Sequence, residues 1–150
     1  MRRSLRKSEL RELNAKIAEK YGVEDFFSKK DHVEMIDSMI EKDGESIFFF
    51  YEGSLVPTLR FLLHNDFPLK RVVVDMGAVR FMASGADVMR PGIVSFDEGI
   101  EKGELVVIVD ETHKKPLAVG KMLFSGSEAS AVGSGKVIKT IHWVGDSIWS

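Results

Sequence analysis

The chain has 150 residues, enough for one substantial hydrophobic core or two small ones, and 44% of them are hydrophobic, as in ordinary globular proteins. It contains no cysteine, which excludes disulfides, thiolate nucleophiles and cysteine-based zinc or iron–sulfur sites. The formal net charge of −2 is a poor match for a protein that coats nucleic acid without selectivity, because phosphate contacts need concentrated Lys and Arg.

The first predicted element is an amphipathic helix that begins after Ser8, a suitable N-cap, and ends before Gly22. Its apolar residues recur at helical spacing: Leu10, Leu13, Ile17 and Tyr21. Residues 1–20 hold seven basic and three acidic side chains, and this basic start either contacts RNA or forms a solvated helix terminus. These charges also interrupt any apolar stretch, so we expect no membrane span or signal peptide and a cytoplasmic location.

The next segment, residues 33–40, fits a helix or a strand. The dipeptide Asp43-Gly44 favours a hairpin into residues 47–51, since it suits a type I′ turn. The aromatic run 48–51 could stack on bases, but a core strand is the stronger interpretation. Pro57 is expected at the first position of a further helix, and a domain boundary follows at residues 69–71.

The stretch 72–93 joins a buried strand to a short helix and a tight turn. Three consecutive valines at 72–74 are typical of a strand, residues 78–84 can form two helical turns, and Gly85 is placed to end them. Pro91 and Gly92 mark a second turn where another backbone or a ligand could approach closely. Arg80 and Arg90 are therefore predicted to flank a polar, glycine-lined ledge.

Short strands separated by glycine-rich turns are predicted for the remainder, which we expect to be all-β: 93–96, 104–109, 116–124 and 137–144. An enzyme is not expected. The four histidines lie far apart in the sequence, without a metal-ligand or triad spacing. The sequence 133–136, GSGK, lacks the upstream glycine and the following Ser or Thr of a phosphate-binding loop.

Four segments of the chain resemble known families. The sequence SGADVMRPGI at 84–93 resembles the signature of the PUA domain, a compact RNA-binding β-barrel, and KVIKTIHWVGDSIW at 136–149 resembles its closing strands. Upstream, VPTLRFLLHNDFP at 56–68 followed by VDMGAVRF at 74–81 is similar to the malignant-T-cell-amplified-sequence family, in which another domain precedes the PUA domain. The absence of cysteine suggests an archaeal member.

The resemblance implies an α/β (α+β) fold with two domains: a small mixed domain in residues 1–70 and a PUA-like β-barrel in residues 71–150. It further implies non-catalytic RNA binding in translation, with small-subunit ribosomal RNA or initiator tRNA as the contact, and no cofactor or metal. The positions that match the RNA-binding ledge of the family are Arg80, Ser84, Gly85, Ala86, Asp87, Met89, Arg90, Pro91 and Gly92. Lys121, Lys136 and Lys139 are further candidates for phosphate contacts.

The ledge has simpler interpretations too. Its glycines and Pro91 are needed for tight turns whether or not RNA binds, and Asp87 could cap a turn. In the eukaryotic family the N-terminal domain recruits a translation factor of the density-regulated type, which makes such a partner possible here. Two other functions stay open: a PUA module that works in trans with an RNA-modification enzyme, and an adaptor that binds only proteins.

Overall fold

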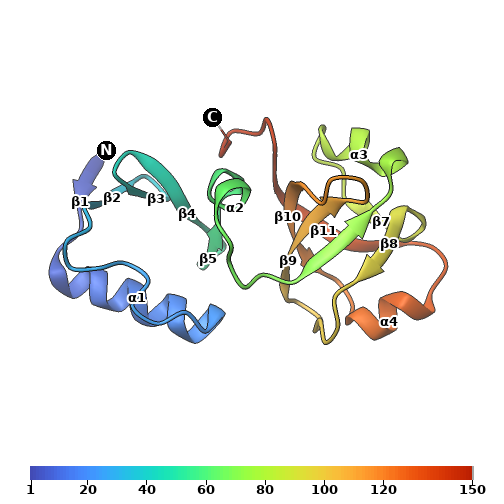
Figure 1. Ribbon diagram of the computed structural model, residues 1–150, viewed down its shortest axis with the longest axis horizontal. Coiled ribbons are helices and arrows are strands. Elements are labelled where there is room, and N and C mark those ends of the chain that lie inside the picture. Colours follow the sequence, from blue (N-terminus) through green and yellow to red (C-terminus); the bar gives the residue numbers. More distant parts are fainter. Residues whose placement is uncertain (150) are drawn as a thin grey trace. The chain divides into compact units, whose positions relative to one another are not determined.

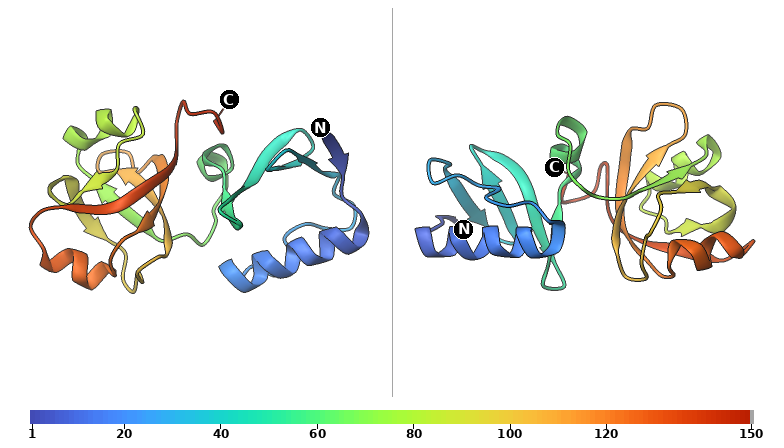
Figure 2. Two further views of the ribbon diagram at one scale, coloured as in Figure 1. Left: turned by 180° about the vertical axis from the view of Figure 1, so that it is seen from behind. Right: turned by 60° about the horizontal axis from the view of Figure 1, so that its bottom comes forward.

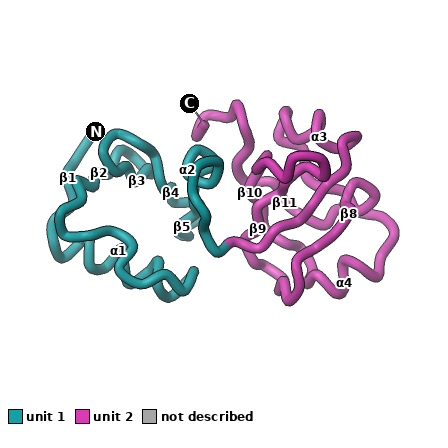
Figure 3. The backbone as a smooth tube through the Cα atoms, viewed as in Figure 1, with its two compact units in different colours: residues 1–68 teal, residues 69–150 magenta. Residues whose placement is uncertain are grey.

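The computed structural model describes residues 1–149 and divides the chain into two compact units, residues 1–68 and 69–150 (Figures 1 and 3). The first unit contains an antiparallel five-stranded sheet in the order β1-β2-β3-β4-β5. Its strands are β1 (Arg2–Ser4), β2 (Val33–Ile36), β3 (Met39–Lys42), β4 (Glu45–Tyr51) and β5 (Ser54–Pro57), and its helices are α1 (Lys7–Tyr21) and α2 (Leu59–His64).

The predicted N-terminal helix is confirmed as α1, which lies along the sheet (Figure 2). Leu13 and Ile17 are buried in the core of the unit, against strand residues such as Phe48. The expected N-cap at Ser8 is wrong. The helix begins two residues earlier than expected, at Lys7, because Glu9 reaches back to the backbone N–H of Arg6, which occupies the N-cap position.

The hairpin at Asp43-Gly44 is confirmed, and both residues have positive φ, at 51° and 82°, as a type I′ turn requires. Residues 33–40 form a second hairpin that the sequence pattern left unresolved, with β2 and β3 joined by a turn at Asp37. The aromatic run in β4 is a core strand, as expected: Phe48 and Phe49 are 0% and 2% exposed, which leaves them no face for a base.

The helix expected to start at Pro57 is displaced. Pro57 is the last residue of β5, where it pairs with Phe48, and α2 begins two residues later. Thr58 is the N-cap, because its hydroxyl oxygen accepts a hydrogen bond from the N–H of Phe61 at 3.2 Å.

The second unit is built on a six-stranded mixed sheet in the order β7-β11-β10-β9-β6-β8. The edge strands β7 and β8 are consecutive in the chain, so a sheet that begins and ends with them is curled, as in a small barrel (Figure 1). The elements are β6 (Arg71–Val74), α3 (Met76–Met82), β7 (Val88–Met89), the 3₁₀ turn η1 (Arg90–Gly92), β8 (Ile93–Phe96), β9 (Leu105–Asp110), β10 (Pro116–Met122), α4 (Gly126–Ala131) and β11 (Lys136–Trp143).

The four later strands are confirmed to within two residues, and β9 is buried along its whole length. The valine run is confirmed as β6, which lies between β9, its parallel neighbour, and β8, its antiparallel neighbour. The expectation that the chain after residue 93 is all-β is wrong, because it contains the helix α4. Ser125 caps the short helix α4, with Glu128 completing a reciprocal capping box, a signal that the glycine-rich context obscured.

Candidate functional site

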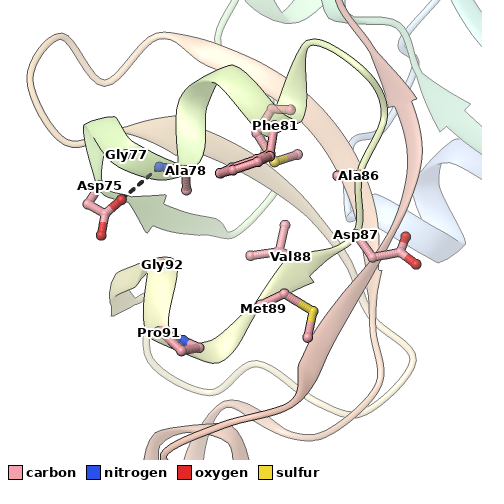
Figure 4. Close-up of a pocket in the computed structure, with 11 residues that line it drawn as sticks. Asp75, Gly77, Ala78, Phe81, Ala86, Asp87, Val88, Met89, Pro91 and Gly92 are labelled. Carbon is pink, nitrogen blue, oxygen red and sulfur yellow. Dashed lines mark hydrogen bonds between the residues drawn. The ribbon is translucent and has the colours of Figure 1, made fainter.

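An apolar pocket of about 480 Å³ opens between α3 and the segment formed by β7 and η1 (Figure 4). Among residues 1–149, the only charged side chains in its lining are two carboxylates, Asp75 and Asp87, and no Lys or Arg of this range lines it. The lining residues are Asp75, Gly77, Ala78, Phe81, Met82, Ala86, Asp87, Val88, Met89, Pro91 and Gly92.

Asp75 positions the start of α3 beside the pocket. Its carboxylate accepts a hydrogen bond from the N–H of Ala78 at 2.8 Å, and its own N–H donates to the carbonyl of Gly92 at 2.9 Å. Glu111, from the turn after β9, accepts from the N–H of Met76 at 2.8 Å. The first turn of α3 is therefore held to η1 and to the β9 end, which fixes one wall of the pocket. The predicted start of the helix at Ala78 was two residues late.

The prediction that Gly85 ends the helix is wrong, because α3 ends at Met82 with Ala83 as its C-cap. Gly85 lies in the turn that follows, with φ at +77°. A glycine is required at this position for a second reason. A Cβ atom built on Gly85 would lie 2.6 Å from the indole ring of Trp143, which packs against the core of the unit. The same position thus satisfies a left-handed turn and allows β11 to pack closely against the loop.

Large apolar side chains are exposed around the opening. Phe81 and Met89 line the pocket and are 57% and 49% exposed, and nearby Met76 is 48% exposed. The ledge expected to be polar is therefore apolar. Phe81 is not among the predicted site residues. Its helical position next to the inward Met82 nevertheless places it on the outward side, where a phenylalanine is uncommon.

Asp87 joins β11 to the pocket. Its carboxylate lies 2.9 Å from Nζ of Lys136 and accepts a hydrogen bond from the N–H of Thr140 at 2.9 Å. The Thr140 hydroxyl donates to the carbonyl of Ala86 at 2.9 Å. Partial burial alone would raise the pKa of Asp87, but Lys136 and the Thr140 N–H outweigh it and lower that pKa. Asp87 is therefore a charged rim residue that also holds the loop, and Lys136 is partly neutralised.

The two arginines do not flank the pocket as predicted. Arg90 points to the protein: its Nε donates to the carbonyl of Ala129 at 2.8 Å, its Nη1 donates to that of Ile93 at 3.2 Å, and the guanidinium lies 5.5 Å from the ring centre of Phe96. Arg80 is exposed and lies over the ring of Phe81, 5.4 Å from its centre. Of these two arginines, only Arg80 therefore directs its guanidinium to solvent beside an apolar side chain of the pocket.

Some of the other predicted residues line the pocket and some do not. Ala86, Asp87, Met89, Pro91 and Gly92 line the pocket, whereas the Ser84 hydroxyl donates to the carbonyl of Phe81 at 2.9 Å and lies outside the lining.

Lys121 and Lys139 face each other across β10 and β11, and both are exposed. Within residues 1–149 neither forms an ion pair, so they make a small cationic site on the outer face of the sheet.

Neither a metal centre nor a membrane helix is found in residues 1–149. No group of three His, Asp or Glu side chains there is arranged to hold an ion, and none of the helices has the length and apolar character to cross a bilayer.

Comparison with known proteins agrees with the fold. The family model for the PUA domain matches residues 70–144. A solved structure of the protein PH0734.1 from Pyrococcus horikoshii superposes with a TM-score of 0.83 at 34% identity, covering 99% of this chain and 98% of that one. This chain is also similar, at 27% identity and a TM-score of 0.51 over 65% of its length and 30% of the other, to a chain of the archaeal box H/ACA sRNP Nop10–Cbf5 complex.

The sequence relatives extend over both units. An uncharacterized protein of Methanocaldococcus jannaschii, MJ1432, is 43% identical over 86% of this chain and 82% of its own length. Translation machinery-associated protein 20 of Saccharomyces cerevisiae is 34% identical over 99% of this chain and 91% of its own, and malignant T-cell-amplified sequence 1-B of Xenopus laevis is 35% identical over 81% and 72%. The chain therefore belongs to the family of PUA-domain proteins that includes translation machinery-associated protein 20 and the malignant-T-cell-amplified-sequence proteins.

Proposed function

We propose that this chain is a non-catalytic RNA-binding protein that acts in translation in the cytoplasm and contacts small-subunit ribosomal RNA or initiator tRNA through its second unit. Its membership of a family of PUA-domain proteins with translation-associated names supports this proposal. The N-terminal unit would then orient the complex, with a translation factor of the density-regulated type as a possible protein partner.

The observation that carries the proposal is the apolar pocket with Phe81 and Met89 exposed at its opening. A solvent-exposed phenylalanine beside a slot of about 480 Å³ can stack on an unpaired base and shield its face from water. Such stacking is worth about 1–3 kcal/mol per base. Because no cation of the described part of the chain lines the pocket, the pocket would receive the base, and the phosphates would lie outside it.

The cations available for phosphates are few. Residues 69–150 contain ten Lys and Arg and ten Asp and Glu side chains, so no general positive field surrounds the unit. Arg80 lies beside Phe81, and Lys121 with Lys139 forms a separate exposed pair. We expect about two or three phosphate contacts and therefore a shallow salt dependence. For single-stranded RNA, each contact should contribute about −0.7 to the slope of the logarithm of affinity against the logarithm of salt concentration.

The test compares Phe81→Ala with Val94→Ala. Both residues are exposed apolar side chains of the same unit, at 57% and 55%, but Val94 lies outside the pocket. Co-sedimentation with small ribosomal subunits and fluorescence anisotropy with initiator tRNA should show binding by the wild type, about tenfold or greater loss in Phe81→Ala, and no loss in Val94→Ala. Equal loss in both variants, or none in either, would remove the pocket from the interaction.

A second candidate function is a PUA module that works in trans with an RNA-modification enzyme. The observation that favours it is the similarity to a chain of the box H/ACA sRNP complex. Copurification of a modification enzyme with tRNA, in place of ribosomal subunits, would support this function. Stoichiometric protein partners without any nucleic acid would instead support a protein-only adaptor.

A further inference from the structure

We propose that a groove in the N-terminal unit binds an acidic protein segment that inserts a large apolar side chain. The groove lies between α1 and the loop at residues 25–29, has a volume of about 660 Å³, and is called the α1 groove here. Lys7, Leu10, Arg11 and Asn14 line it from the helix, and Phe27 and Lys29 line it from the loop. The α1 groove lies in a different unit from the apolar pocket beside α3, which is called the RNA pocket from here on, and the proposal does not depend on RNA binding.

The α1 groove is formed without a ligand, because hydrogen bonds hold its two walls together. Its four helical residues follow the spacing i, i+3, i+4 and i+7, so they lie on one stripe of α1. The chain after α1 folds back beside this stripe on its way to β2 (Figure 2). Asn14 holds it there with two hydrogen bonds to Phe27: its Nδ2 donates to the carbonyl at 2.8 Å and its Oδ1 accepts from the N–H at 3.0 Å. A groove held in this way needs little ordering when a ligand binds.

The N-terminal basic residues divide into two groups. Arg2, Arg3 and Arg6 are bound by glutamates of their own unit, Arg2 by Glu34 and Glu41 and the other two by Glu9. These arginines therefore have a structural role.

The cations of the α1 groove are different. Lys7, Arg11 and Lys29 form no ion pair with any residue in the described range 1–149, and the only carboxylate in the lining is Asp25. Lys7 and Arg11 are like charges at i and i+4, and Lys7 stands in the first turn of the helix, where the dipole disfavours a cation. Both arrangements disfavour the helical state of α1, and an anionic ligand would offset both.

Charge and apolarity together indicate a protein ligand. Residues 1–68 contain eleven basic and thirteen acidic side chains, so the unit as a whole repels a polyanion such as RNA. A short acidic segment interacts mainly with the local cations, because salt limits the interaction between exposed charges to distances of about 8–10 Å. The half-buried Leu10 and the buried Phe27 provide an apolar floor, which suits an aromatic or aliphatic anchor between carboxylates.

The proposal is tested with synthetic peptides and the full-length protein. The probe is an acetylated and amidated peptide of sequence Glu-Asp-Glu-Phe-Asp-Glu, compared with the same peptide carrying Ala for Phe or Lys for every acid. Titration into ¹⁵N-labelled protein should shift the amide signals of residues 7–14 and 25–29 first. We expect affinity to fall about fivefold or more for each altered peptide and for the variants Arg11→Glu and Lys29→Glu.

Lys30→Glu is the matched control, since Lys30 is an exposed neighbour of Lys29 outside the lining and carries the same charge. It should retain binding within about twofold. Loss in Lys30→Glu equal to that in Lys29→Glu would reduce the effect to net charge and overturn the proposal. Absence of shifts in the α1 groove, or stronger shifts there with oligouridylate than with the acidic peptide, would also overturn it. Variants of the RNA pocket leave this test unaffected, so the two proposals fail separately.

Discussion

Asp87 and Lys136 form an ion pair of 2.9 Å between the loop that leads into β7 and the first residue of β11. The pair lies at the rim of the apolar pocket, since Asp87 is part of the lining. Lys136 is therefore not a freely available phosphate contact. Its charge is shared with a carboxylate that also fixes the backbone of Thr140.

Replacing Asp87 with Asn should increase RNA affinity while slightly reducing stability. The amide can still accept a hydrogen bond from Thr140, but it no longer neutralises Lys136, so one cation is released for phosphate. We expect affinity to rise about two- to threefold, and the free energy of unfolding to fall by about 0.2–1 kcal/mol, as for an exposed ion pair. Anisotropy titrations and urea unfolding measure the two effects. A loss of affinity would show that the carboxylate itself contacts the RNA.

Substitution of Arg90 should reduce stability, whereas substitution of Arg80 should reduce RNA binding. Arg90→Met removes two charge-assisted hydrogen bonds to the carbonyls of Ala129 and Ile93, so unfolding free energy should fall by about 1.5–3 kcal/mol and the melting temperature by about 5 °C. Arg80→Ala should change stability by less than about 0.5 kcal/mol yet weaken RNA binding. Calorimetry with a binding titration distinguishes them. A thermally neutral Arg90→Met would contradict its structural role.

Gly85→Ala should be strongly destabilising, whereas Gly133→Ala should be nearly neutral. At Gly85 the new methyl group meets the Trp143 ring at 2.6 Å and φ is +77°, while a Cβ on Gly133 meets nothing within 4 Å. Steric overlap and the left-handed backbone together cost about 2–4 kcal/mol, against about 0.5 kcal/mol or less for the control. Denaturant unfolding followed by tryptophan fluorescence measures both. Comparable midpoints would mean that the loop moves away from β11 without difficulty.

The stability of the protein should fall on mild acidification because of His142. The ring is fully buried and its Nδ1 lies 2.8 Å from Asp146. Burial lowers the pKa of His142, and Asp146 offsets this only in part. Protons therefore bind the unfolded state more readily, so this contribution is complete above about pH 6.5 and decreases as the pH falls below it.

Urea unfolding at pH 7.5 and 5.5 measures this effect. The pH dependence should be smaller in His142→Gln than in the wild type, and it should persist in the control His113→Asn, because His113 is 77% exposed. An equal slope in wild type and His142→Gln would assign the effect to another group.

Local patterns predicted the regular elements well where a few adjacent residues decide the conformation. The apolar spacing of α1, the Asp43-Gly44 turn and the valine run of β6 depend on helical periodicity, positive φ and β-branching, all readable over short windows. The errors occurred where capping interactions compete. Glu9 moved the start of α1 to Lys7, Thr58 displaced the helix expected at Pro57, and Ser125 started a helix in a segment expected to be a turn.

The sequence by itself determined the PUA resemblance, because contiguous motifs carry it, and that resemblance predicted the two domains and the ledge. Only the tertiary structure decided which side chains of the ledge are free. Arg90 is bound by carbonyls from α4 and β8, Lys136 by Asp87, and Phe81 is left exposed at the pocket. Pairing between groups far apart in the chain depends on how strands and loops are brought together, and no local pattern encodes it.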